Sequence, residues 1–182
     1  MDEKTPTDEL RDEHEHARAA IAEFQRKIDV LCDGTDSSSP EVAGDLRNDL
    51  DQLCRSLLLH FRKEEEGLFP DVLQMVSRGA PRVDILGEFF GEETDDDLKA
   101  HHLLRGRLRQ LRELLDAADK ADGLDPETSG RLRALTSATR DLLERHADKE
   151  HKLVFPMIER LLDPEQMAAA GERMRALRRE SD

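Results

Sequence analysis

The sequence predicts an all-α protein, an up-down-up-down four-helix bundle followed by a short extra C-terminal helix. Three observations lead to this prediction. Apolar residues recur with the helical period, and no segment shows the two-residue alternation of a half-buried strand. Four amphipathic segments alternate with brief connections rich in glycine, proline and polar residues. The chain has 182 residues, enough for one domain with a sizeable core.

The first two helices are predicted from their start and stop signals. The first begins at Thr5-Pro6, because threonine is a good N-cap and proline suits the first helical position, and it ends at Gly34. The second begins at Ser39-Pro40 and runs to about Arg78, before a stretch containing glycine and proline. A less regular segment follows, in which Phe89-Phe90 belongs to a short apolar turn of helix.

The third helix is predicted to begin near Thr94, because three aspartates follow it and suit the positive end of a helix dipole, and to end at Gly123. Asp125-Pro126 then caps a fourth helix that runs to about Leu162. A fifth, short helix starts at Asp163-Pro164. We therefore expect residues 1–162 to form the bundle and residues 163–182 to form an appended helix, which either covers the bundle or pairs two subunits.

One sequence motif occurs twice in the chain. His60 is followed four residues later by Glu64 and then by Leu-Phe-Pro, and His146 is followed by Glu150 and then by Val-Phe-Pro. Residues four apart lie on one face of a helix, so each histidine and its glutamate are directed toward the same point. The proline in each copy lacks a backbone N–H, so we expect a kink or a helix end there.

The repeat extends upstream to two further histidines. His14 and His101 each begin a stripe of apolar residues at helical spacing, which predicts that both side chains point inward. His16 and His102 do not share these stripes, so we expect them on flanking or solvated faces. The leucines that precede His60 and His146 form two more apolar stripes.

Four inward imidazoles and two inward carboxylates predict a metal centre, because a buried ionised glutamate is costly unless it is paired or bound to metal. Imidazole and carboxylate without thiolate suit iron, zinc or manganese. One metal cannot use six protein ligands and keep an open position, whereas two metals can, with the two glutamates placed to bridge them. The predicted ligands are His14, His60, Glu64, His101, His146 and Glu150.

With these residues, the chain resembles the hemerythrin-like (HHE cation-binding) family over roughly residues 8–160. The resemblance implies a four-helix bundle around two non-haem iron ions, bridged by carboxylates and an oxo or hydroxo group, with the six predicted ligands holding the iron. Oxygen-carrying members add a fifth histidine four residues after the first ligand of the third helix, but this chain has Arg105 there. The fifth nitrogen ligand is then missing or supplied by His102, His16 or His151.

Composition restricts the partners and the compartment. The formal net charge of −14 argues against nucleic acid or an anionic membrane as a partner, and no apolar run is long enough to cross a bilayer. Cys32 and Cys54 do not form a disulfide framework, so we expect a cytoplasmic protein. A sensing role would require a homodimer or a separate signalling partner, because no second domain is long enough to be an output module.

The leading functional hypothesis is a di-iron protein that binds oxygen, nitric oxide or peroxide for sensing or detoxification. An alternative is an enzyme with catalase-like, peroxidase-like or nitric oxide reductase activity, and a third is iron storage or handling. The sequence assigns no catalytic acid or base and no organic cofactor. Glu65 and His151, each one residue past a predicted ligand, are the best candidates for proton relays. The sequence contains no tryptophan or tyrosine, so tyrosinate ligation and tyrosyl radicals are excluded within it.

Overall fold

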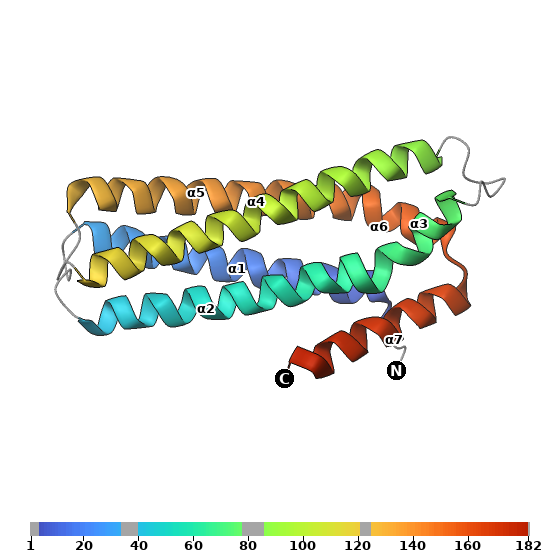
Figure 1. Ribbon diagram of the computed structural model, residues 1–182, viewed down its shortest axis with the longest axis horizontal. Helices are drawn as coiled ribbons and strands as arrows, with labels where there is room; N and C mark the ends of the chain where they lie inside the picture. The colour runs from blue at the N-terminus through green and yellow to red at the C-terminus, as the bar shows by residue number, and fades with distance from the viewer. Residues whose placement is uncertain (1–3, 34–39, 78–85, 121–124, 182) are drawn as a thin grey trace. The chain divides into compact units, whose positions relative to one another are not determined.

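The computed structural model describes residues 4–33, 40–77, 86–120 and 125–181, and this part of the chain is helical without a strand (Figure 1). It divides into two compact units. Unit 1 comprises residues 1–14, 58–101 and 145–182, and unit 2 comprises residues 15–57 and 102–144. The all-α class is therefore as predicted. The up-down-up-down order stays a prediction, because the connections between the long helices lie outside the described residues.

Helix α1 (Pro6–Cys32) starts where its N-cap predicts. The Asp8 backbone N–H donates a hydrogen bond to Thr5 Oγ1 at 3.2 Å, which satisfies one of the N–H groups that the first turn of a helix leaves without a backbone partner. The predicted end at Gly34 lies just outside the described residues.

The second predicted helix consists of three consecutive helical segments. Helix α2 (Pro40–Arg62) passes into the π-helical segment η1 (Lys63–Leu68), and α3 (Phe69–Ser77) follows directly. In η1 the Phe69 N–H donates to the Glu64 carbonyl, five residues back. This wider turn lies immediately before Phe69 and Pro70, so the chain does not leave the helical conformation at the proline, and the expected kink stays a prediction.

The second copy of the repeated motif shows the same change from α-helix to π-helix. Helix α5 (Pro126–Lys149) passes into η2 (Glu150–Val154), and α6 (Phe155–Leu161) follows. The Phe155 N–H donates to the Glu150 carbonyl in η2. In both copies the glutamate predicted as a ligand lies in the π-helical segment, and single π-turns inside α-helices occur frequently at functional sites.

The predicted start of the third helix near Thr94 is wrong. Helix α4 runs without a break from Leu86 to Lys120, so Phe89-Phe90 belongs to the same helix as His101. The reason is that no proline lies between Leu86 and Thr94, and the two glycines there, at positions 87 and 91, each cost a helix interior only about 1 kcal/mol. The acidic residues after Thr94 therefore lie inside a helix rather than in its first turn.

Aspartate caps begin the remaining helices as predicted. Asp125 Oδ1 accepts a hydrogen bond from the Thr128 N–H at 2.9 Å, at the start of α5. At the start of α7 (Pro164–Ser181), Asp163 Oδ1 accepts from the Gln166 N–H at 2.8 Å, and Gln166 Oε1 accepts from the Asp163 N–H at 3.0 Å. This reciprocal pair is a capping box, so the sequence stops one helix and starts the next within two residues.

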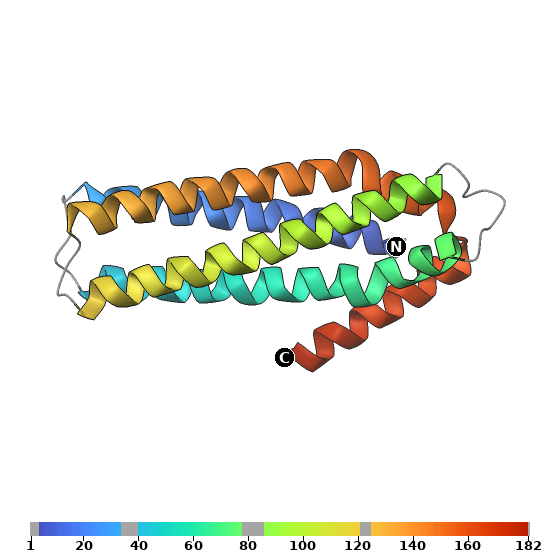
Figure 2. The same cartoon turned by 45° about the horizontal axis from the view of Figure 1, so that its top comes forward.

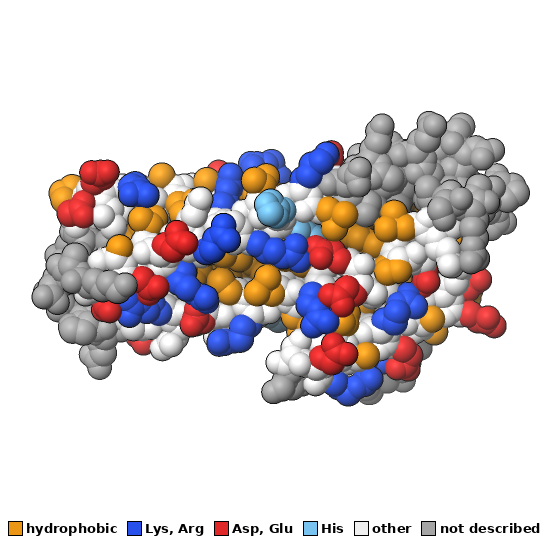
Figure 3. Space-filling view, in the orientation of Figure 1, with side chains coloured by type: hydrophobic (Ala, Val, Ile, Leu, Met, Phe, Trp, Pro, Cys, Tyr) orange, Lys and Arg blue, Asp and Glu red, His pale blue; other side chains and the backbone are white. Residues whose placement is uncertain are grey.

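Unit 2 contains the apolar stripes that the periodicity predicts. Each of α1, α2, α4 and α5 contributes buried side chains to it, which are Ile21, Phe24, Ile28, Leu46, Leu50, Leu53, Leu57, Leu104, Leu108, Leu111, Leu115, Leu132 and Leu143. Acidic and basic side chains are interspersed on the face of the molecule that Figure 3 shows. No helix in the described ranges is sufficiently long and apolar to cross a bilayer.

The core of unit 1 includes helix α7. Ala170 and Met174 of α7 lie in one buried cluster with Leu10, Leu68 and Phe69. Figures 1 and 2 both show α7 running alongside the end of α2 and α3. The helix that we expected to be appended to the bundle is thus part of the hydrophobic core of this unit.

Helix α7 packs closely against the π-helical segment η1. The Arg173 guanidinium donates to the Gly67 carbonyl oxygen from Nε at 3.0 Å and from Nη2 at 2.8 Å, and it also forms an ion pair with Asp71. A Cβ atom added at Gly67 would lie 2.7 Å from Met174 Cγ. Glycine at this position therefore permits the close approach of α7 to the segment that contains Glu64.

We expect Gly67→Ala to lower the free energy of unfolding by about 1–3 kcal/mol, because the added methyl group overlaps Met174 and the contact with α7 has to open. Gly130→Ala is the matched control: Gly130 lies inside α5, and nothing stands within 4 Å of its added Cβ, so helix propensity should raise stability slightly. Urea unfolding followed by circular dichroism measures both. Equal stability of Gly67→Ala and the unmodified chain would contradict the tight packing of α7.

Candidate metal centre

The structure places all six predicted ligands in the interior of unit 1. They come from α1, α2, η1, α4, α5 and η2, so six segments supply one side chain each. Their relative exposures are His14 1%, His60 3%, Glu64 0%, His101 0%, His146 3% and Glu150 0%. Burial this complete, for residue types that normally lie at the surface, has to be offset by strong polar interactions among them.

The four imidazoles form two pairs that face each other through Nε2. The Nε2 atoms of His14 and His60 are 2.9 Å apart, and those of His101 and His146 are 3.1 Å apart. Within each neutral pair, one nitrogen has to donate and the other accept. A cation between the two nitrogens would let both rings direct a lone pair inward.

Glu64 connects the two pairs. Its Oε1 lies 3.2 Å from His60 Nε2, and its Oε2 lies 3.1 Å from His101 Nε2. One carboxylate therefore has an oxygen directed at a histidine of each pair, which is the arrangement required of a bridging ligand.

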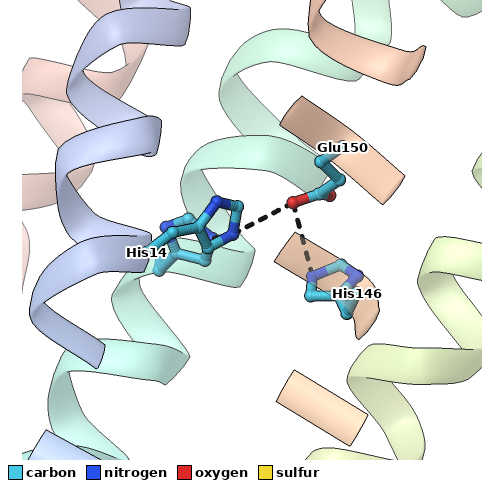
Figure 4. A group of neighbouring side chains, drawn as sticks. His14, His146 and Glu150 are labelled. Carbon is cyan, nitrogen blue, oxygen red and sulfur yellow. Dashed lines mark hydrogen bonds and ion pairs between the residues drawn. The ribbon is translucent and has the colours of Figure 1, made fainter. Parts of the chain in front are cut away.

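Glu150 makes the corresponding connection on the other copy of the repeat. Its Oε2 lies 3.0 Å from His14 Nε2 and 3.5 Å from His146 Nε2 (Figure 4). The internal duplication of the sequence thus becomes an approximate twofold relation in the site, in which each glutamate reaches one histidine of each pair.

The buried oxygens of these two glutamates support a cation site. Among the described residues, none of the four carboxylate oxygens of Glu64 and Glu150 has a hydrogen-bond partner of acceptable geometry, although imidazole nitrogens lie close to them. Two groups of four potential ligand atoms, each within 4.8 Å of one another, occur here and share His146 and Glu150. A bound metal would satisfy these oxygens and the converging nitrogens together, so the donor set fits a metal ion.

Without metal, the pKa values of the two buried carboxyl groups shift in opposite directions. Burial raises the pKa of Glu150, and the nearby negative charges of Glu64 and Asp97 raise it further. Burial acts in the same direction on Glu64, but the facing imidazoles of His60 and His101 outweigh it and hold the pKa of Glu64 well below its usual range. Without metal, the surroundings therefore favour the neutral form of Glu150 and the ionised form of Glu64.

The pKa values of the buried imidazoles also shift in both directions. Burial lowers the pKa of His14 and of His146, which favours their neutral, ligating form. Burial opposes the charge on His60 as well, but Glu64 and a hydrogen bond to Glu13 outweigh it and raise the pKa of His60 to about 9. Metal binding would thus displace protons from the site, as metal binding by histidine and carboxylate generally does.

Three of the four buried histidines have a hydrogen-bond partner for the outer nitrogen, and the fourth, His146, has a carboxylate only at ion-pair distance. Two of these partners are the residues that we singled out as candidate proton relays. Glu65 Oε1 lies 2.8 Å from His101 Nδ1, and His151 Nε2 lies 3.0 Å from His14 Nδ1. Such outer partners fix the orientation and tautomer of a ligating imidazole.

The other two outer partners were missed by sequence reasoning. Glu13 Oε2 lies 3.1 Å from His60 Nδ1, and Asp97 Oδ1 lies 3.7 Å from His146 Nδ1. Glu13 directly precedes His14, and Asp97 precedes His101 by four residues, so a helical projection places both beside the inward face. In a chain so rich in acidic residues, nothing in the sequence distinguishes these two from solvated carboxylates.

A buried lysine, Lys63, forms an ion pair with Glu13. Lys63 is 0% exposed and forms ion pairs with Glu9 at 2.7 Å and with Glu13. Arg178 of α7 lies 2.8 Å from Glu9 and 3.5 Å from Glu13. The hydrogen bonds that Glu13 accepts from His60 and Lys63 lower its pKa in spite of its burial, so this outer carboxylate is ionised.

The flanking histidines behave as the apolar stripes predict. His16 and His102 are exposed, which separates them from the six buried side chains. His151 is the one of the three alternative fifth ligands that lies beside the cluster, and its Nε2 faces an outer imidazole nitrogen.

Comparison with known proteins identifies the same pattern. The family model described as the hemerythrin HHE cation binding domain matches residues 5–89 and 93–182. The two matched stretches contain all six buried ligand candidates. No curated protein matches the chain.

We expect Glu150→Gln to separate folding from metal binding. In the metal-free protein, the raised pKa of Glu150 means that the folded state binds its proton more tightly than the unfolded state does. The contribution of Glu150 to the stability of the metal-free wild type should therefore fall as pH rises above about 4.3, the ordinary glutamate value, toward the raised folded-state pKa. The amide cannot ionise, so at pH 8 metal-free Glu150→Gln should be more stable than metal-free wild type.

Thermal unfolding with and without a divalent metal measures both effects. Metal at 100 times its dissociation constant should stabilise the wild type by about 2.7 kcal/mol and Glu150→Gln by much less. Glu144→Gln, a substitution of a half-buried glutamate elsewhere on α5, is the control and should retain the wild-type response. An undiminished stabilisation of Glu150→Gln by metal would exclude Glu150 as a ligand.

Proposed function

The chain belongs to the hemerythrin HHE cation-binding family, and we propose that it is a non-haem di-iron protein that binds oxygen, nitric oxide or peroxide for sensing or detoxification. The observation that carries this proposal is the position of Glu64 and Glu150. Each of these buried carboxylates reaches an Nε2 atom of both imidazole pairs. A site for two ions, with two nitrogens each and shared carboxylates, follows most directly from this arrangement.

The proposal assigns one residue set to each iron ion. His14 and His60 would hold the first ion, and His101 and His146 would hold the second. Glu64 and Glu150 would bridge the two, together with an oxo or hydroxo group. Four nitrogens and two carboxylates would leave coordination positions for a small ligand on ions that prefer six partners, and iron, when bound, would supply the redox chemistry.

The surrounding side chains keep the site dry and the imidazoles oriented. The Phe61 ring stacks on His101, with centroids 4.1 Å apart and planes at 21°. The Phe155 ring stacks on His14, with centroids 5.9 Å apart and planes at 16°. Both phenylalanines are fully buried, so they exclude water from the outer faces of the rings and strengthen every charge interaction inside.

Enzymatic turnover of peroxide or nitric oxide is the second candidate, and the outer carboxylates favour it. Glu65 Oε1 is 2.8 Å from His101 Nδ1, and the Glu65 side chain is 24% exposed, so a proton can pass between solvent and the outer nitrogen of a buried imidazole. Glu13 stands in the same relation to His60 and is 25% exposed. These two carboxylates could take up or release the Nδ1 proton of a ligating imidazole, and so adjust the charge of the site as the charge of a bound ion changes.

Compartment and partners belong to the same proposal. A cytoplasmic location is supported by Cys32 and Cys54, which are both free thiols. The acidic surface disfavours nucleic acid and anionic membranes as partners. For sensing, the state of the site would have to be read by a second copy of the chain or by a separate signalling protein.

The decisive experiment is ferrous loading without air, followed by metal analysis and visible spectra through one cycle of oxygenation and deoxygenation. We expect two irons per chain and a visible band that appears with oxygen and disappears on its removal. The sequence contains no tryptophan or tyrosine, so any strong band above the phenylalanine region reports the metal centre.

The control is Glu64→Gln, which replaces one bridging carboxylate by an isosteric amide and should abolish both the second iron and the band. An irreversible change of the spectrum together with turnover of added peroxide would favour the enzymatic candidate over reversible binding. Iron content well below two per chain under saturating conditions would overturn the di-iron proposal itself.

A further inference from the structure

Helix α7 contacts the π-helical segment η1 at the turn that contains Glu64. The Arg173 guanidinium donates two hydrogen bonds to the Gly67 carbonyl oxygen, from Nε at 3.0 Å and from Nη2 at 2.8 Å. The same Nη2 atom forms an ion pair with Asp71 of α3. One side chain of α7 is therefore bound both to the backbone of η1 and to the helix that follows η1.

Apolar packing reinforces this contact. Met174, the next residue of α7, lies in one buried cluster with Leu68 and Phe69, which directly follow Gly67. A Cβ atom added at Gly67 would lie 2.7 Å from Met174 Cγ, so glycine permits the close approach. The corresponding residue in the second copy of the motif, three positions after its glutamate, is Leu153. The small residue that admits α7 therefore occurs in the first copy only.

A second arginine of α7 reaches the group behind His60. Glu13 directs Oε2 at His60 Nδ1, 3.1 Å away, and its Oε1 forms an ion pair with the fully buried Lys63. Arg178 lies 3.5 Å from the same Oε1 and 2.8 Å from Glu9, which also pairs with Lys63. The Arg178 side chain is 52% exposed, so water weakens its effect on Glu13. Glu13 nevertheless connects His60 to α7.

We propose that α7 is a positioning element of the metal centre, with Arg173 as its principal residue. By holding the Gly67 carbonyl, Arg173 fixes the turn from which Glu64 reaches both imidazole pairs, and this raises the affinity of the site for a divalent metal ion. The inference rests on the metal site proposed above and requires only that Glu64 is a ligand. Arg173 acts through the backbone of η1, not through contact with the ion.

The position of Glu64 has to be accurate because the carboxylate serves two imidazoles. Its Oε1 lies 3.2 Å from His60 Nε2, and its Oε2 lies 3.1 Å from His101 Nε2. Groups that bind a metal have to be held within about 0.5 Å of the productive geometry by the residues around them. A π-helical turn is a rare conformation, so neighbouring elements have to support it, and Arg173 supplies such support at Gly67.

Titration of the metal-free full chain with Co²⁺ tests the proposal, with a competing chelator to set the free concentration and visible absorption to follow binding. Arg173→Met removes every donor nitrogen and should raise the dissociation constant by about tenfold, the lower end of the effect of groups behind metal ligands. It should also shift the visible bands of bound Co²⁺, because a displaced Glu64 changes the coordination geometry. Arg173→Lys keeps a cation near the Gly67 carbonyl and should recover part of the affinity.

Two controls separate positioning from charge and from stability. Arg179→Met makes the same substitution at an exposed position of α7 and should leave the dissociation constant unchanged. Ile28→Val shortens a fully buried side chain of unit 2 and therefore lowers the stability of the fold. Its dissociation constant and Co²⁺ bands should equal those of the wild type. Circular dichroism of each variant establishes that it is folded before its titration is interpreted.

The coupling can also be measured in the opposite direction, because linkage between two sites is reciprocal. If docking of α7 raises the affinity for metal, bound metal has to strengthen the docking of α7. Binding of Co²⁺ should therefore slow hydrogen exchange at the amides of α7 (Pro164–Ser181) in the wild type, and slow it less in Arg173→Met. Equal slowing in the two proteins would contradict the coupling.

The possible outcomes separate this inference from the function on which it rests. A wild type that binds no Co²⁺ would overturn the metal site itself. One ion per chain, with an affinity that still falls in Arg173→Met, would overturn the two-metal function and support the role of α7. A dissociation constant and Co²⁺ spectrum of Arg173→Met equal to those of the wild type, or an equal loss of affinity in Ile28→Val, would overturn the inference and leave the metal site standing.

Discussion

The rest of this structure depends on the cost of removing two carboxylates and four imidazoles from water at one place. An unpaired ionised carboxylate in a protein interior costs several kcal/mol. Glu64 and Glu150 are fully buried: the imidazoles of His60 and His101 offset this cost for Glu64, and the raised pKa of Glu150 favours its neutral form. Much of the surrounding architecture, including the outer partners of the histidines and the buried Lys63, can be understood as compensation for this arrangement.

The π-helical segments show how the backbone takes part in that compensation. A regular α-helix places residues i and i+4 on one face, which suffices to aim His60 and Glu64 in the same direction. The wider turn that begins at Lys63 accommodates the following Phe-Pro pair without ending the helix. In the first copy the Gly67 carbonyl of this turn accepts hydrogen bonds from Arg173 of α7. Local geometry and tertiary packing therefore hold the segment that presents Glu64.

The sequence predicted which histidines and glutamates are buried together more completely than it predicted the helix boundaries or the residues around this cluster. Periodicity separated the buried His14 from the exposed His16, because inward positions on a helix carry a pattern that a single sequence displays. The start of α4 was missed because acidic residues near position 94 resemble a first helical turn, and only the fold shows that the helix already exists. Asp97 was missed because its partner belongs to another helix, and such contacts leave no trace at fixed spacing along the chain.

The two copies of the repeat preserve the ligands but differ in what stands behind them. Each copy has a lysine immediately before its ligand glutamate: Lys63 is fully buried against Glu9 and Glu13, whereas Lys149 is partly exposed beside Asp97. A cation in this position keeps an outer carboxylate ionised inside the protein, because it compensates the charge without occupying the ligand side of the site. How deeply that cation is buried determines how much negative charge remains to act on the neighbouring histidine. Duplication thus accounts for the symmetry of the six candidate ligands, and divergence in the residues beside them gives the two halves of the cluster different surroundings.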